Sequence, residues 1–288
     1  METFTPLLKK PLLKSFKRFF REVLKTSLGK DVRDAQGNTL AHFAVLYGDA
    51  EDIKNYRALL EVKNHKQISA KDLLAFLEPS SKKPTLYVYK TQENCFSYFS
   101  SEETKRYFQI DLLDHLLFQK REYLDWTIKK CSKKLQESSL EIRNKWSYNL
   151  YGRALLEKKR PLTYIKWVNP LIGYGLFAGE DIVQYGLIGE YTGVIRKRSH
   201  KLDRYNHYIF GYVTGDEDTP FVIDAEKQGN HTRFINHSDD PNLQSTWLIT
   251  QGICHIVFVA RYKIPKDTQL TYDYGPTYWT KRSSPLTV

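Results

Sequence analysis

The chain has 288 residues, enough for about two domains. Hydrophobic residues make up 41% and aromatic residues 14%, which excludes wholesale disorder, and no run of about 18 apolar residues occurs. The formal charge of +11 concentrates in residues 1–150, which hold 27 Lys and Arg against 19 Asp and Glu. This excess predicts an acidic partner such as chromatin, nucleic acid or anionic lipid, or simple solubility.

Cysteine usage and the N-terminus indicate the compartment. The three cysteines, Cys95, Cys131 and Cys254, are widely spaced, which indicates free thiols in a reducing compartment. The first residues have no signal-peptide pattern, so we expect a soluble protein.

The first predicted element is an amphipathic helix over residues 12–25. Apolar residues recur at helical spacing on one face, and Lys and Arg fill the opposite face. Such a helix docks onto its own core, or it binds a membrane surface or a partner.

The next segment, residues 34–49, reads D-A-Q-G-N-T-L-A-H-F-A-V-L-Y-G-D. It resembles a single ankyrin repeat over residues 31–56, with Leu40 where the pattern has proline. In that repeat the threonine and the histidine, here Thr39 and His42, tie the turn to the start of the helix. No second good copy follows at a spacing of about 33 residues. We therefore expect a degenerate unit capped by other helices, with a structural role or a role in partner recognition.

Further helices are predicted through the first half of the chain. Residues 69–72, S-A-K-D, form a capping-type start, residues 112–126 and 135–146 have helical apolar spacing, and residues 87–89 suggest a strand fragment. Residues 158–161, K-K-R-P, suggest a hinge, a solvated turn or a weak nuclear-import signal. We therefore expect a helical N-terminal domain at 1–157 and a second domain at 158–288.

The second domain carries four motifs in order. Residues 172–178 set two glycines around a tyrosine, Gly173-Tyr174-Gly175, where a ligand could lie against bare backbone amides. Residues 189–193 read G-E-Y-T-G, and residues 224–242 read D-A-E-K-Q-G-N-H-T-R-F-I-N-H-S-D-D-P-N. Residues 270–275 read L-T-Y-D-Y-G, with two tyrosines at period two on one face of a strand.

Together and in this order, the four motifs resemble those of the SET-domain protein-lysine methyltransferases, over about residues 160–280. The resemblance implies an α+β fold, in which the helical N-terminal domain precedes a mostly β SET domain. It implies short antiparallel sheets and a C-terminal segment that threads through a loop. It also implies S-adenosylmethionine as cofactor, S-adenosylhomocysteine as product, and a lysine amine as methyl acceptor. Because a lysine with a pKa of about 10.4 must react as the neutral amine, we expect a desolvating aromatic channel.

The resemblance assigns three tyrosines to catalysis. Tyr274 matches the family's catalytic tyrosine, and Tyr191 matches the second tyrosine of the channel. Core packing with a satisfied hydroxyl is the alternative role for Tyr191. Tyr272 falls where relatives have Phe or Tyr, and a hydroxyl there retains a water and leaves less room for added methyl groups. The resemblance therefore favours mono-methylation.

The same resemblance implies the cofactor contacts. Asn236 and His237 match the residues that grip the amino-acid end and the adenine, while Arg233 is equally suited to a structural ion pair. The complete predicted set is Gly173, Tyr174, Gly175, Tyr208, Arg233, Phe234, Asn236, His237 and Tyr274.

One departure from the family concerns metal. Many relatives follow the last motif with a cysteine-rich segment that binds zinc and closes the lysine channel. No cysteine follows Cys254 here, so neither zinc nor another metal is expected. Tyr278 and Trp279 are candidates to complete the channel instead.

The partner is predicted from the resemblance as a protein with an accessible lysine, a histone tail first. Residues 196–201, R-K-R-S-H-K, occupy the family's variable insert, where positive charge disfavours a basic tail, whereas the acids at 216–218 would attract one. Compact SET proteins of this kind resemble those that host-associated bacteria deliver into eukaryotic cells. The expected location is the nucleus or chromatin, of a host cell if the protein is a secreted effector.

Two alternative functions stay open at this point. One is a catalytically weak SET and ankyrin-like interaction module that recruits a protein partner. The other is a basic nucleic-acid or membrane binder, which requires clustered basic side chains on one exposed face.

Overall fold

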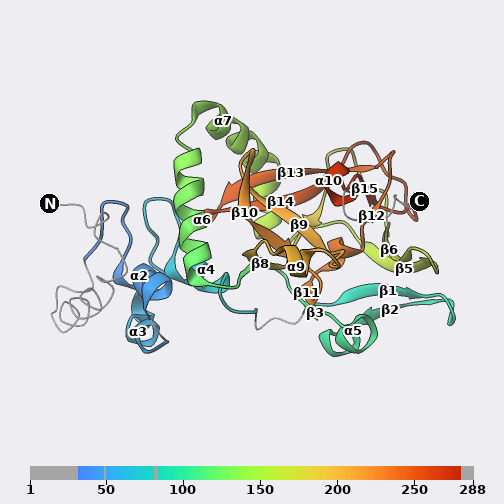
Figure 1. The fold of residues 1–288 in the computed structure, drawn as a ribbon, viewed down its shortest axis with the longest axis horizontal. Coiled ribbons are helices and arrows are strands. Elements are labelled where there is room, and N and C mark those ends of the chain that lie inside the picture. Colours follow the sequence, from blue (N-terminus) through green and yellow to red (C-terminus); the bar gives the residue numbers. More distant parts are fainter. Residues whose placement is uncertain (1–31, 49, 81–83, 280–288) are drawn as a thin grey trace.

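Helices dominate the first half of the chain and short sheets dominate the second half (Figure 1). The computed structural model describes residues 32–48, 50–80 and 84–279. Within these residues the α+β fold class is confirmed, with a helical N-terminal region ahead of a β-rich part. The predicted helix at residues 12–25 lies outside the described residues.

The N-terminal region contains two similar turn-and-helix units. In the first, a bridge joins Arg33 to Thr39 ahead of α2 (Leu40–Tyr47), and in the second a bridge joins Lys63 to Ser69 ahead of α4 (Ala70–Ala75). The helix α3 (Ala50–Asn55) and the 3-10 turn η2 (Arg57–Leu59) connect them. Sequence reasoning missed the second unit, because its turn residues differ from those of the first.

The two units are held together by polar contacts. The backbone N–H of Thr39 donates to His42 Nδ1 at 3.1 Å, and His42 Nε2 lies 2.9 Å from the carbonyl oxygen of Ile68 in the second unit. Asn64 Nδ2 donates to Asn38 Oδ1 at 2.7 Å, which joins the two turns. The contacts of Thr39 and His42 are those expected at this position, and the resemblance to an ankyrin repeat stays a prediction.

Three more helices lie between the N-terminal units and the β-rich part. They are α5 (Ser101–Phe108), α6 (Arg121–Lys134) and α7 (Ser138–Ser147), and α7 continues through a π-helical turn, η3 (Tyr148–Gly152), into α8 (Arg153–Leu156). The helix predicted to begin at residue 112 begins at Arg121 instead. The residues before it pair with strands, as β3 (Asp111–Leu112) and β4 (Leu117–Phe118), so tertiary pairing overrides the local helical pattern.

Strands from both sides of residue 157 share the same sheets. The hairpin β1 (Leu86–Lys90) and β2 (Cys95–Phe99) joins β5 (Thr163–Asn169) and β6 (Gly173–Ala178) in the order β2-β1-β5-β6. In addition, β3 pairs with β11 (Gln228–Gly229), and β4 pairs with β8 (Val194–Lys197). A domain division at residues 157 and 158 stays a prediction, and these pairings connect its two sides.

The remaining strands complete the β-rich part. The sheet of β4 and β8 continues through β10 (Glu217–Asp224) to β9 (Ile209–Thr214), with the short α9 (His200–Asp203) inserted before β9. A second sheet has the order β13 (Leu243–Thr250), β14 (Ile253–Ala260), β7 (Leu187–Glu190). Its central strand β14 is buried along its whole length. The last elements are η4 (His231–Phe234), β12 (Asn236–His237), β15 (Thr271–Tyr272) and α10 (Pro276–Trp279).

One core runs through both parts of the chain. Phe99 and Leu124 from the first half and Leu176, Ile195 and Phe258 from the second half belong to the same buried cluster. The helical half therefore packs on the sheets, and part of the stability of the site comes from residues outside it. Threading of the C-terminal segment through a loop stays a prediction.

Asn144 connects α7 to the sheet of β13, and its loss should destabilise the fold. Its side chain donates to the carbonyl oxygen of Ile249 at 3.1 Å and accepts the N–H of Ile249 at 2.5 Å. We expect Asn144→Ala to lower the free energy of unfolding by about 1–3 kcal/mol, because it leaves two buried backbone groups of β13 without partners. Urea denaturation measures the change, with the exposed Asn149→Ala as control, for which we expect a change within about 0.5 kcal/mol. Equal effects would show that this side chain does not stabilise the sheet.

Candidate functional site

The short parallel pair of β12 and β15 brings two predicted site segments together. Asn236 lies opposite Thr271, and His237 lies opposite Tyr272. The backbone N–H of Tyr274 donates to His237 Nδ1 at 3.2 Å, and the Tyr274 hydroxyl donates to the carbonyl oxygen of Ile235 at 2.7 Å. Residues 236–237 and 272–274, separated by more than 30 positions in the sequence, therefore form one structural unit.

The G-x-G segment lies against this unit. Asn236 Nδ2 donates to the carbonyl oxygen of Tyr174 at 3.2 Å. A Cβ at Gly175 would stand 2.8 Å from Gln269 Nε2 and 3.1 Å from Asn236 Nδ2, so only glycine permits this approach. Gly173 has φ of +79°, a left-handed conformation that glycine adopts without strain. Gly175 thus serves a close contact inside the protein and Gly173 a left-handed turn, and contact of these glycines with a ligand stays a prediction.

A second group contains Tyr191, Tyr208 and Arg233. The Tyr191 hydroxyl donates to the carbonyl oxygen of Tyr208 at 3.0 Å. The guanidinium carbon of Arg233 lies 3.7 Å from the centroid of the Tyr208 ring, a cation–π contact, and Arg233 Nε donates to the carbonyl oxygen of Ala225 at 2.9 Å. Arg233 is thus held by carbonyl oxygens and a ring face, and its burial lowers its pKa.

An aromatic wall joins the two groups. The ring of Tyr191 lies 5.2 Å from that of Phe210, Phe210 lies 6.0 Å from Tyr272, and Tyr272 lies 6.3 Å from Tyr274. The Phe258 ring packs against this wall, with its centroid 5.0 Å from that of Tyr272. The three tyrosines predicted to form a channel therefore lie along one continuous set of rings.

Burial keeps these phenols protonated. It raises the pKa of Tyr191, Tyr272 and Tyr274 above the ordinary tyrosine value. A wall of neutral phenols offers hydroxyl groups and ring faces but no phenolate base at neutral pH. Any proton that a bound amine must lose therefore has to leave by another route.

The C-terminal aromatics lie on the same site. The ring of Tyr278 is 4.7 Å from that of Tyr274, and the ring of Trp279 is 4.9 Å from that of His237. His207 Nδ1 lies 3.1 Å from the Tyr278 hydroxyl, which ties α10 to the segment before β9. Tyr278 and Trp279 thus lie at one end of the aromatic wall, and their completion of a channel stays a prediction.

Sequence reasoning missed a support for the site in the helical half. Phe108, at the end of α5, places its ring 5.0 Å from Tyr174 and 5.1 Å from Phe234. Two predicted cofactor residues are therefore packed against a residue that lies outside all four motifs. No sequence signal indicates this contact, because it depends on how α5 packs on β6.

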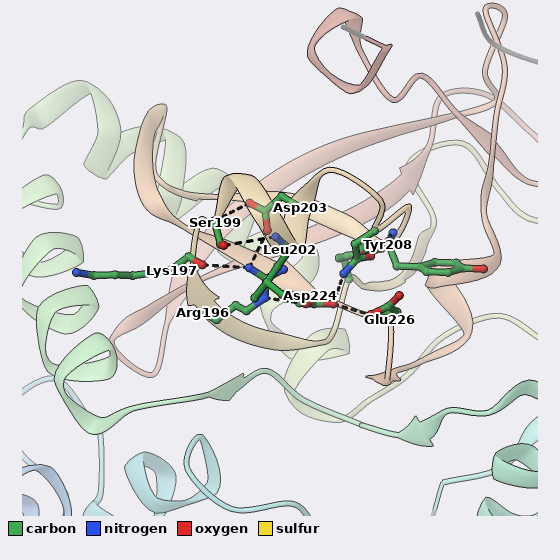
Figure 2. A network of polar contacts seen from close by, with 10 residues as sticks. Arg196, Lys197, Ser199, Leu202, Asp203, Tyr208, Asp224 and Glu226 are labelled. Carbon is green, nitrogen blue, oxygen red and sulfur yellow. Dashed lines mark hydrogen bonds and ion pairs between the residues drawn. The ribbon is translucent and has the colours of Figure 1, made fainter. Parts of the chain in front are cut away.

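The insert between Tyr191 and Tyr208 is organised by an ion-pair network (Figure 2). The buried guanidinium of Arg196 donates to Asp224 Oδ2 at 2.7 Å and to Asp203 Oδ1 at 2.8 Å. Asn206 Nδ2 donates to Asp224 Oδ1 at 2.8 Å, and Asn206 Oδ1 accepts the N–H of Tyr208. Arg196 therefore positions the insert and Tyr208. Its charge is paired inside the protein, so it does not face a bound peptide, contrary to the expectation from the sequence.

The acidic segment at 216–218 forms ion pairs within the protein, and its attraction for a basic tail stays a prediction. Asp216 is bound by Arg143 at 2.6 Å, and Glu217 is bound by Lys130 and Lys134 at 2.9 and 2.8 Å. Two of the three acids are neutralised by cations of α6 and α7, which sequence distance concealed.

The described residues contain neither a metal-binding cluster nor a membrane-spanning helix. Among the residues that the structure describes, no three His, Cys, Asp or Glu side chains gather in a way that could hold a metal ion. Cys95, Cys131 and Cys254 are free thiols. None of the described helices is both long and apolar enough to span a bilayer.

The strands and turns of this site are similar to those of known proteins. Residues 173–275 match the sequence profile of the SET domain family. A histone-lysine N-methyltransferase of Arabidopsis thaliana, SUVH5, H3 lysine-9 specific, is 39% identical over 109 residues, 36% of this chain and 14% of that protein. Histone-lysine N-methyltransferase set-2 of Caenorhabditis elegans is 38% identical over 111 residues, 35% of this chain and 7% of that protein.

A third relative targets a different lysine. An H3 lysine-4 specific histone-lysine N-methyltransferase of Aspergillus oryzae is 35% identical over 129 residues, 42% of this chain and 10% of that protein. This chain spans between 7% and 14% of the length of these three relatives. The similarity is thus local, and it concerns the residues that build the site.

His231, which lies beside this site, makes the free energy of unfolding depend on pH. It is buried between Arg160, which donates to Nδ1, and the carbonyl oxygen of Ile188, 3.2 Å from Nε2. Burial, and then the Arg160 charge, hold its pKa well below the ordinary value of 6.5. The unfolded chain therefore takes up a proton that the folded chain excludes, so stability falls as pH falls below about 6.5.

We expect His231→Gln to be less sensitive to acid than the wild type. Between pH 7.5 and 5.5 the wild type should lose up to about 1.4 kcal/mol per pH unit below 6.5 through this residue. Thermal unfolding at both pH values measures the difference, with the exposed His200→Gln as control. If His231→Gln and His200→Gln show the same pH dependence, His231 is not the acid-sensitive group.

Proposed function

We propose that this chain, whose residues 173–275 match the SET domain family, transfers methyl groups from S-adenosylmethionine to lysine side chains of a protein. The observation that carries the proposal is the meeting of three motifs at one place. The G-x-G segment, the Asn236-His237 turn and Tyr274 are joined by direct hydrogen bonds. The three relatives above are named as histone-lysine N-methyltransferases.

The residues present suit the cofactor. Gly175 leaves open a space that a single Cβ would fill, between Gln269 Nε2 and Asn236 Nδ2. The Gln269 amide nitrogen is buried and has no acceptor among the described residues, so it is available to a ligand. Backbone groups of Gly173 to Gly175, the Asn236 amide and the His237 ring would hold the cofactor, with Tyr208 and Arg233 on the far side. When bound, S-adenosylmethionine supplies an activated methyl group on a sulfonium sulfur.

The aromatic wall prepares the lysine. An ammonium in water has a pKa of about 10.4, and only the neutral amine can attack a methyl carbon. Removal of water by rings such as Tyr191, Phe210 and Tyr272 disfavours the charged form and lowers that pKa. Since these phenols stay neutral, the proton passes to solvent before the amine is enclosed, and no side-chain base is needed.

Tyr274 orients the reacting groups. Its hydroxyl proton is donated to the carbonyl oxygen of Ile235, so the phenolic oxygen is left as an acceptor. An acceptor fixed beside a methyl group that carries partial positive charge stabilises that charge without reorganisation. Holding the amine, the methyl carbon and the sulfur in line supplies much of the remaining rate.

Histones are the proposed substrate class, and chromatin the proposed location. The relatives are named for two different lysines of histone H3, so likeness to them supports histones and leaves the lysine open. The Tyr272 hydroxyl lies 3.1 Å from Ser245 Oγ and takes up space beside the aromatic wall. The smaller space for added methyl groups supports mono-methylation.

We expect Tyr274→Phe to reduce methyl transfer at least 100-fold, because the acceptor oxygen beside the methyl group is lost. The measurement uses labelled S-adenosylmethionine with core histones. Binding of S-adenosylhomocysteine, measured by calorimetry, should change less than about fivefold. The exposed Tyr185→Phe is the matched control and should keep full activity. Equal labelling by both variants would remove Tyr274 from the mechanism.

Tyr272→Phe should change the number of methyl groups added. Loss of the hydroxyl that contacts Ser245 makes room beside the amine, so di- and trimethylated products should appear. Mass spectrometry of a peptide substrate at several times separates the products. A variant that still stops at one methyl group would assign the product limit to another residue.

A further inference from the structure

A cavity of about 580 Å³ lies between α5, the β1–β2 hairpin and the start of β6, apart from the methyl-transfer wall. Four of the rings that line it are defined here as the aromatic pocket: Phe99, Tyr107, Trp167 and Tyr174. Tyr107 is 55% exposed and Trp167 is 40% exposed, which is unusual for side chains of this size. Exposed rings that line a concave site indicate a ligand rather than core packing.

Neighbouring rings of the aromatic pocket stand nearly at right angles. The centroids of Phe99 and Tyr107 are 5.3 Å apart at 73°, and those of Tyr107 and Tyr174 are 6.1 Å apart at 69°. Trp167 lies opposite Tyr174 in the β5–β6 pair, at 5.1 Å and 77°. The Tyr174 hydroxyl donates to the Tyr107 hydroxyl at 3.2 Å, which fixes two of the walls. Rings arranged in this way present several π surfaces to one enclosed group.

The charged residues of the cavity place carboxylates and cations beside its rings in equal number. Two carboxylates, Glu93 and Glu103, line it together with Lys90 and Arg106. Lys90 is paired with Glu93 at 3.1 Å, and its ammonium lies 5.9 Å from the Phe99 ring centroid. The wall therefore already holds one cation against a ring beside a carboxylate. Glu103 Oε2 accepts the N–H of Ser100 at 2.8 Å, which holds the second carboxylate in place.

We propose that the aromatic pocket binds a methylated ammonium group, the side chain of di- or trimethyl-lysine in a peptide. Ring faces attract cations through their quadrupole, and methyl groups spread the charge and weaken hydration. Unmodified lysine keeps a compact, strongly hydrated ammonium that costs more to bring out of water. The choice of lysine over another methylated amine rests on the proposed function, in which this chain handles lysine-bearing tails.

The aromatic pocket and the methyl-transfer site share one strand but use different groups of it. The backbone carbonyl of Tyr174 accepts from Asn236, whereas the Tyr174 ring and hydroxyl contact Trp167 and Tyr107. Phe108 packs between the Tyr174 ring and Phe234. The protein could thus hold one methylated lysine while a second lysine enters the other site.

The test is peptide binding in the absence of S-adenosylmethionine, followed by fluorescence anisotropy. The peptides are identical except for one lysine, which is unmodified, dimethylated or trimethylated. We expect the trimethylated peptide to bind at least tenfold more tightly than the unmodified one. A neutral isostere with carbon in place of the quaternary nitrogen should bind at least fivefold more weakly than the trimethylated form. Equal binding of the unmodified and trimethylated peptides, or of the isostere and the cation, overturns the proposal.

Choline chloride tests whether the aromatic pocket binds a free quaternary ammonium compound in place of methylated lysine. At millimolar concentration it should compete only weakly, because it lacks the peptide that flanks the lysine. If choline alone binds as tightly as the trimethylated peptide, the assignment to lysine is wrong. Saturating S-adenosylhomocysteine should leave peptide binding unchanged, and competition would show that the cavity belongs to the cofactor site.

Variants locate the binding. Trp167→Ala and Tyr107→Leu should each weaken binding of the trimethylated peptide at least tenfold. Trp167→Phe should lose less affinity than Trp167→Ala, because it keeps an aromatic ring. Tyr98→Ala is the control, since Tyr98 is 65% exposed and points to the opposite face of β2 from Phe99. Thermal unfolding checks that each variant is folded. Unchanged binding by folded Trp167→Ala overturns the proposal.

Tyr274→Phe separates this proposal from the proposed function. It should bind the trimethylated peptide as the wild type does, whatever its activity. Loss of peptide binding in this variant would show that the peptide binds in the methyl-transfer site, which overturns its assignment to the aromatic pocket. If the protein binds the trimethylated peptide but transfers no methyl group, the proposal for the aromatic pocket holds and only the proposed enzymatic function is refuted.

Discussion

The site depends on a pairing of two short strands, β12 and β15, each two residues long. It sets Asn236 opposite Thr271 and His237 opposite Tyr272. A parallel pair cannot be closed by a tight turn, so the intervening chain must leave and return through β13 and β14. That excursion buries β14 completely and gives the short pair a rigid support. Without it, the Asn236-His237 turn and Tyr274 would not share hydrogen bonds.

Burial determines the chemistry of the aromatic wall. The same desolvation that keeps Tyr191 and Tyr274 as neutral phenols would act on a lysine amine placed beside them, in the direction that makes it a nucleophile. One physical effect therefore prepares the acceptor and keeps the phenols as hydroxyl donors and acceptors. The hydrogen bonds of these hydroxyls to backbone carbonyls of Tyr208 and Ile235 orient the wall without adding charge.

The helical half is structurally part of the site. Its hairpin β1–β2 extends the sheet that bears the G-x-G segment, and Phe108 supports both Tyr174 and Phe234. Asn144 of α7 binds the backbone of β13, and the cations of α6 and α7 pair with Asp216 and Glu217 at the start of β10. These contacts join residues far apart in sequence, so a change in the helical half can move the site. The aromatic pocket arises at this same junction.

The sequence by itself determined which residue types form the proposed methyl-transfer site. Gly173 to Gly175, the Asn236-His237 turn and Tyr274 are local motifs, and their order along the chain was sufficient to predict a common site. Only the tertiary structure decided what the charged and aromatic residues outside those motifs contact. Arg196 is paired inside the molecule, and Trp167 lines the same cavity as Tyr107. Local patterns record backbone preference and spacing, whereas pairing across long loops depends on packing that no single segment encodes.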